Sequence, residues 1–178
     1  KDKPYNQTLT ALSDTLLATS WPAEAQATLL ADLTLDELRA WRSQQFRRLS
    51  VRGGLHGNVA IDDANALADL LTTLLPLDQV AHTRPMVRQL TQSAEIDLAV
   101  DHDDAALLLY VQDPDDSFSS RAKSALAGQL LRSPFFSSLR TDQQLGYVVS
   151  AGMRRMDTQS GNLFLVQSPS AGVAHIEN

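Results

Sequence analysis

The 178-residue sequence contains no cysteine. Disulfide bonds, thiolate zinc sites, iron–sulfur clusters and cysteine nucleophiles are therefore excluded from it. Long apolar runs are also missing, because the run over residues 105–111 is far shorter than the roughly 20 residues that a membrane span needs. We therefore expect no membrane span. The start Lys1-Asp2-Lys3-Pro4 resembles no signal peptide and lacks an initial Met, which suggests a trimmed piece of a longer protein.

Basic residues are fewer than acidic ones: 15 Lys and Arg stand against 21 Asp and Glu, for a net charge of −6. This excess of negative charge argues against nucleic acid or anionic lipid as a partner. With 43% hydrophobic and 20% charged residues, the composition is that of an ordinary folded protein. The length suits one domain or parts of two.

Apolar residues recur at helical spacing in the first 76 residues. Thr34 and Glu37 form a capping box, and Asp62 and Asp63 suit the first turn of a later helix. We expect helices before Pro22, over 24–31, from 34 to about 48, and from 62 to before Pro76, with a strand over 49–55. The last helix should bury a stripe formed by Ala64, Leu67, Leu71 and Leu74.

The pattern changes to strands after residue 93, beyond a segment over 77–93 that reads as a linker. Alternation over 96–100 and the apolar run over 105–111 predict a hairpin whose second strand is buried on both faces. Two further strands are expected over 147–153 and 162–167, joined through 157–161. Helices and strands thus occur in blocks, which is typical of an α+β fold built on an antiparallel sheet packed by helices.

One long helix is expected between these strands. Asp116 or Ser117 should cap it, and Ser133-Pro134 should end it. A second capping signal pairs Thr141 with Gln144. The inner face of the long helix should carry apolar side chains, namely Phe118, Ala122, Ala125, Leu126 and Leu130.

The sequence carries no metal-binding motif of a peptidase. None of the four histidines, which are His56, His82, His102 and His175, belongs to HExxH or HxxEH. The acidic segment over 101–104 fits either a hard cation or a solvated turn. Ser150 lacks the leading Gly of a nucleophile elbow. We therefore expect this chain to bind no metal or cofactor by itself.

Residues 133–155, SPFFSSLRTDQQLGYVVSAGMRR, are followed by GNLFLVQS at 161–168. These phrases closely resemble the last domain of the pitrilysin and insulin-degrading-enzyme (insulinase) family, the inverted-motif zinc peptidases. TLDELRAW at 34–41 and LHGNV at 55–59 resemble the closing part of that family's third domain. The resemblance covers essentially the entire chain.

The resemblance implies a clamshell of four α/β roll domains with zinc held in the first. Residues 1–76 would then be the C-terminal part of the third roll domain, 77–93 a linker, and 94–178 the N-terminal part of the fourth. The implied partners are peptide substrates and the N-terminal catalytic half of the same protein. Bacterial relatives imply a periplasmic location.

Arg140 and Tyr147 match the Arg and Tyr with which the family contacts the peptide being cut. A guanidinium and a phenol can both donate hydrogen bonds to a carbonyl oxygen that gains negative charge. Considered alone, Arg140 could instead satisfy a helix end and Tyr147 pack at a strand edge. The matched phrase favours the role of Arg140 and Tyr147 in peptide binding. We expect Gln144 and Gly146 to form the turn and to have no catalytic role.

We therefore expect a non-catalytic segment of a zinc metalloendopeptidase that is inactive by itself. It would form part of the wall of the substrate chamber and position the peptide. The alternative is an inactive structural or interaction subunit of the same fold. The chain ends before the helices that should cover its last sheet. Exposed apolar surface around Leu163, Phe164 and Leu165, with self-association, is therefore also expected.

Overall fold

The computed structural model describes residues 3–78 and 84–177. These residues form two compact units. One contains the residues up to Trp21 together with those from Pro85 onward, and the other contains the described residues between them. The first unit holds the sheet, so the first helix belongs with the sheet despite its distance in sequence. The division into a third and a fourth roll domain, with a linker over 77–93, stays a prediction, and residues 79–83 of that linker lie outside the described residues.

The sheet of the first unit is antiparallel and consists of β1 (Ala105–Gln112), β2 (Val148–Met156) and β3 (Gln159–Ser168) in the order β1-β3-β2. β3 is central, and its Phe164 lies between Leu109 of β1 and Ala151 of β2. The predicted hairpin between 96–100 and 105–111 is wrong, because residues 96–100 form no strand and β1 pairs with β3 instead. A register that buries both faces of β3 outweighs the local alternation at 96–100.

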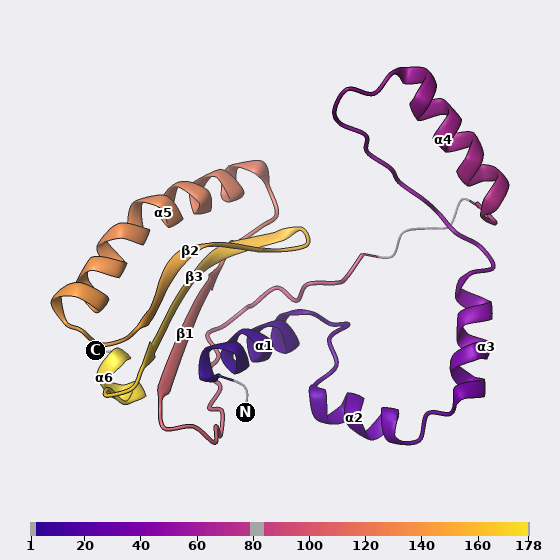
Figure 1. Cartoon of the computed structure of the whole chain (residues 1–178). Coiled ribbons are helices and arrows are strands. Elements are labelled where there is room, and N and C mark those ends of the chain that lie inside the picture. The colour runs from indigo at the N-terminus through magenta and orange to yellow at the C-terminus, as the bar shows by residue number, and fades with distance from the viewer. Residues whose placement is uncertain (1–2, 79–83, 178) are drawn as a thin grey trace. The chain divides into compact units, whose positions relative to one another are not determined.

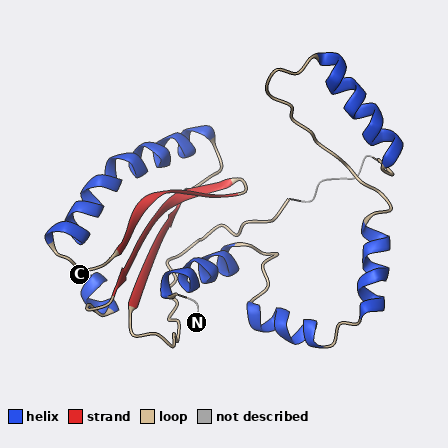
Figure 2. Ribbon diagram, viewed as in Figure 1, coloured by secondary structure: helices blue, strands red, loops and turns tan. Residues whose placement is uncertain are grey.

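Helices cover both faces of this sheet, α1 (Pro4–Leu16) on one and α5 (Phe118–Phe136) on the other (Figures 1 and 2). Alternation along β3 therefore sends Leu163, Leu165 and Gln167 toward α1 and Phe164 and Val166 toward α5. Leu163 and Leu165 are buried and Phe164 is partly buried. The expected exposed patch at 163–165 is thus wrong, because α1 and α5 already cover the central strand.

The face of α5 that packs on the sheet is small and polar. Its buried residues are Ser120, Ser124 and Gly128, whereas Phe118 and Leu130 are 79% and 65% exposed. A Cβ at Gly128 would lie 2.7 Å from the backbone nitrogen of Met153, so only glycine permits this approach. The predicted apolar inner face is wrong, because close backbone packing selects small side chains at i, i+4 and i+8.

A polar network links this helix face to the sheet. The Ser124 hydroxyl donates to the Asp113 carboxylate, and the Asn162 amide donates to the Ser124 oxygen at 3.3 Å. Asp113 also joins β1 to β3, because its backbone N–H donates to the carbonyl of Ser160 at 2.8 Å. These side-chain hydrogen bonds tie α5 to the sheet and so help to fix how the helix lies on it.

The ends of α5 follow one prediction and contradict another. Ser117 is the N-cap and accepts from the N–H of Ser120 at 3.1 Å. The helix passes through Pro134 rather than ending there, and the π-helical turn η1 (Ser137–Asp142) continues from it. Proline's fixed φ is compatible with a helix, and the missing hydrogen bond lies on an exposed side where water can satisfy the carbonyl. The capping signal at Thr141 starts no new helix, because Thr141 lies within η1.

Asp115 just before α5 provides a pH prediction. Its carboxylate accepts from the N–H of Ser117 at 2.9 Å, and the Ser117 and Ser120 side chains with this N–H lower its pKa to about 2. Because the pKa of Asp115 is lower in the folded chain than its value near 3.8 in the unfolded chain, the ionised carboxylate stabilises the fold above pH 3.8. This stabilisation is lost as the pH falls toward 2. A carboxyl NMR titration should therefore give a midpoint near pH 2. Ser120→Ala should raise it, and an unchanged midpoint in that variant would contradict the assigned cause.

The far end of the sheet carries the main apolar core. Val149, Val166 and Ile176 of α6 (Val173–Glu177) form it, packed by Phe135 and Leu139. The Phe135 and Phe164 ring centroids are 5.3 Å apart. At the opposite end, Asp157 and Thr158 alone separate β2 from β3, so the expected turn over 157–161 is shorter than predicted.

The second unit contains α2 (Ala23–Ala31), α3 (Leu35–Gln45) and α4 (Ile61–Leu74), close to the predicted bounds. The Thr34–Glu37 capping box is present, with Glu37 accepting from the Thr34 N–H at 2.8 Å. The strand expected over 49–55 is wrong, because the segment makes one isolated bridge between Leu49 and Leu77. The stripe on α4 is not buried either, since no described residue of α2, α3 or α4 is.

Candidate functional site

The two predicted site residues lie in one segment that connects α5 to β2. η1 carries Arg140, and the chain then turns sharply at Gln144, whose φ is 54°. Leu145 is buried, and its N–H donates to the carbonyl of Leu139 at 2.8 Å. This anchor closes the turn and leaves Tyr147 just before the first residue of β2.

Arg140 is exposed at the end of η1. Its Nη1 donates to the backbone carbonyl of Tyr147, and its guanidinium carbon lies 5.4 Å from the centroid of the Phe136 ring. Both contacts hold the guanidinium in place. A guanidinium has five N–H donors, and the hydrogen bond described above uses one of them. The other donors can therefore bind a ligand.

Tyr147 is 45% exposed, and its hydroxyl donates to Oδ2 of Asp104 at 2.7 Å. Nε2 of Gln167 donates to the same Asp104 oxygen at 2.7 Å and also to the Tyr147 hydroxyl. The bond to Asp104 raises the pKa of Tyr147, so the phenol keeps its proton. The bonds from Tyr147 and Gln167 in turn lower the pKa of the Asp104 carboxyl.

The structure thus brings Arg140 and Tyr147 together through the Tyr147 backbone, and it adds Asp104 and Gln167 to the site. Neither addition was predicted. Asp104 belongs to the acidic segment 101–104, and Gln167 follows the apolar run 163–166 of β3. Gln167 is fully buried, which its sequence context does not reveal, because β3 carries other polar residues as well.

The described residues do not fit a metal ion. Within 3–78 and 84–177, no three His, Cys, Asp or Glu side chains gather into a group that could hold one. Nδ1 of His102 accepts from the N–H of Asp104 at 3.0 Å, so the segment 101–104 is organised as a turn. His82 lies outside the described residues. The polar groups that this site presents are the guanidinium of Arg140 and the hydroxyl of Tyr147, which is hydrogen-bonded to Asp104.

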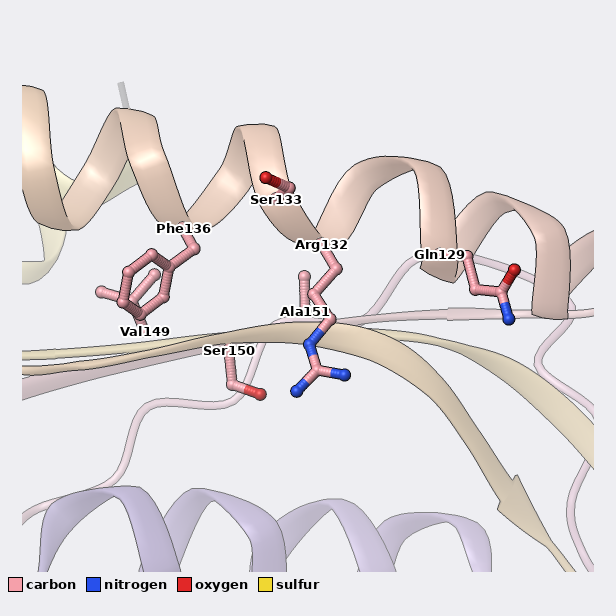
Figure 3. Close-up of a pocket in the computed structure, with 7 residues that line it drawn as sticks. All are labelled: Gln129, Arg132, Ser133, Phe136, Val149, Ser150 and Ala151. Atoms are coloured by element: carbon pink, nitrogen blue, oxygen red, sulfur yellow. The ribbon is translucent and has the colours of Figure 1, made fainter.

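A cavity of about 360 Å³ lies between α5 and β2 (Figure 3). Arg132 reaches from α5 toward β2, and Phe136 lies over Val149. The other residues that line the cavity are Gln129, Ser133, Ser150 and Ala151. Phe136 also supports the Arg140 guanidinium, so the cavity adjoins the candidate site. No helix of the described residues is long and apolar enough to cross a membrane.

The chain is similar in sequence and in fold to known proteins. Residues 126–178 match the family described as PQQ synthase PqqF-like, C-terminal lobe domain 4. Human insulin-degrading enzyme is 28% identical over 94% of the chain, and the chain covers 17% of that protein. Coenzyme PQQ synthesis protein F of Pseudomonas protegens is 44% identical over 40% of the chain and 9% of its own length.

The crystal structure of pitrilysin matches 96% of the chain with a TM-score of 0.69 and 26% identity, and the match covers 19% of the pitrilysin chain. The helices around an antiparallel three-stranded sheet therefore define a peptidase-family α+β fold. The chain is thus similar to the pitrilysin and insulin-degrading-enzyme family, and its residues 126–178 match a domain of the C-terminal lobe. It spans less than a fifth of the relatives described.

Proposed function

We propose that this chain forms part of the wall of the substrate chamber in a zinc-dependent metalloendopeptidase. In this proposal Arg140 and Tyr147 bind the scissile peptide. The observation that carries the proposal is the placement of a guanidinium and a protonated phenol on one exposed segment. Zinc would be held by the N-terminal half of the same protein and would supply the activated water. This chain would add hydrogen bonds only.

The donors suit a carbonyl oxygen that gains negative charge during attack. Hydrogen bonds to a charged acceptor are stronger than those to a neutral one, so Arg140 and Tyr147 would stabilise the transition state more than the bound peptide. Preorganisation supports the same role, because the Tyr147 carbonyl and the Phe136 ring fix the guanidinium before any ligand arrives.

An inactive structural or interaction subunit of the same fold is the second candidate. The exposed apolar side chains of α3 and α4, which include Leu35, Trp41, Ile61 and Leu74, favour a surface that contacts other protein. We propose the N-terminal half of the parent as that partner, with self-association of the isolated chain when it is absent. A periplasmic location is part of the same proposal.

Metal removal distinguishes the two candidates. The full-length protein should hydrolyse unstructured peptides, lose this activity after dialysis against a zinc chelator, and regain it when zinc is added. Binding of the same peptides without hydrolysis, in protein that has been loaded with zinc, would support the inactive subunit instead. Far-UV circular dichroism should be unchanged by the chelator for the 178-residue chain, because its described residues do not fit a metal ion.

A further inference from the structure

The Tyr147 hydroxyl is already engaged. A phenol has a single proton, and here that proton is donated to Oδ2 of Asp104 at 2.7 Å. The Tyr147 oxygen meanwhile accepts from Nε2 of Gln167. A hydroxyl in this arrangement has no second proton for a peptide carbonyl. Asp104 and the peptide must therefore compete for it.

The arrangement is firmly built rather than a passing surface contact. Gln167 has no exposed surface, and its three hydrogen bonds use both ends of the amide. Nε2 binds Asp104 and Tyr147, while Oε1 accepts from the N–H of Tyr5 at 3.0 Å. The Asp104 side chain is only 13% exposed. The β3 strand and the first turn of α1 thus hold the acceptor in place.

We propose that Asp104 is a positioning residue that retains the Tyr147 proton until a peptide displaces it. This inference rests on the proposed function of Tyr147. The carboxylate is a stronger acceptor than a neutral carbonyl, so breaking its bond to Tyr147 opposes peptide binding. A peptide carbonyl oxygen becomes a hydrogen-bond acceptor as strong as the Asp104 carboxylate only while it gains negative charge. The exchange therefore delays donation by Tyr147 until the reacting carbonyl becomes anionic.

Asp104→Asn in the full-length protein tests the proposal, because it keeps the shape and removes the charge. We expect kcat/KM for a peptide to rise about fivefold, as a neutral acceptor holds the phenol less strongly. Asp103→Asn makes the same charge change at the neighbouring exposed position and should have no effect. Asp104→Ala, which removes the acceptor altogether, serves as a second variant and should also raise kcat/KM.

The rise must depend on the Tyr147 hydroxyl. In the Tyr147→Phe background, Asp104→Asn should leave kcat/KM unchanged, whereas a purely structural role would act equally in both backgrounds. A lower or unchanged kcat/KM in both Asp104 variants, with Tyr147→Phe impaired, would overturn the role of Asp104 alone. Normal kcat/KM in Tyr147→Phe would overturn this inference together with the proposed function of Tyr147.

Discussion

Arg140→Ala and Tyr147→Phe, each in the full-length protein, are expected to lower kcat for peptide hydrolysis by about 100- to 1,000-fold. Each variant removes a donor that would act mainly on the charge developing in the transition state. The loss should therefore appear in kcat and kcat/KM together, with KM little changed. Steady-state kinetics on one peptide, with zinc content measured by atomic absorption, checks both points, and the zinc content should be that of the parent.

Matched controls are available on the same sheet. Tyr110→Phe removes a hydroxyl that is buried without a hydrogen-bond partner, and it should leave kcat unchanged. Arg155→Ala removes an exposed guanidinium of β2 that donates to the Asp157 carbonyl, and it should also be neutral. Because Arg140 also binds the Tyr147 carbonyl, Arg140→Lys should restore part of the activity. Normal turnover in both site variants would refute the assigned roles.

The predictable part of the fold depended on local signals. Ser117 caps α5, the Thr34–Glu37 capping box starts α3, and the apolar run at 105–111 becomes β1. Each element is specified by residues within a few positions of it. Pairing is different, since the partner of β1 lies more than 40 residues away on β3. The alternation at 96–100 therefore predicts a strand that does not form in the tertiary structure.

The face of α5 shows why burial was harder to predict than helicity. An apolar stripe was expected to face the sheet, yet Ser120, Ser124 and Gly128 face it. Their small size permits close backbone approach, which hydrophobicity does not measure. The same limit applies to the site, where Arg140 and Tyr147 came from a resemblance. Asp104 and Gln167 became visible only when β3 brought them within 2.7 Å of each other.

Gly146→Ala should destabilise the chain by about 3 kcal/mol, because it overpacks a site that cannot relax. A Cβ at Gly146 would lie 2.3 Å from the carbonyl oxygen of Gln167 and 3.2 Å from Cγ1 of Val166. Gln167 belongs to the central strand, which is paired with β1 and β2, so its backbone cannot retreat without breaking the sheet. Denaturant unfolding followed by far-UV circular dichroism measures the loss.

Gly152→Ala is the matched control, since a Cβ at Gly152 in β2 would meet nothing within 4 Å. This variant should keep the parental free energy of unfolding or gain a few tenths of a kcal/mol through reduced entropy of the unfolded chain. Equal losses in the two variants would show that an added Cβ is costly in β2 as well as before it, and that the close approach at Gly146 has no special effect. A loss confined to Gly146→Ala would mean that the close approach beside Tyr147 is what requires glycine. It would also tie the position of Tyr147 to the packing of Gln167, because the displaced carbonyl belongs to the residue that donates to the Tyr147 hydroxyl.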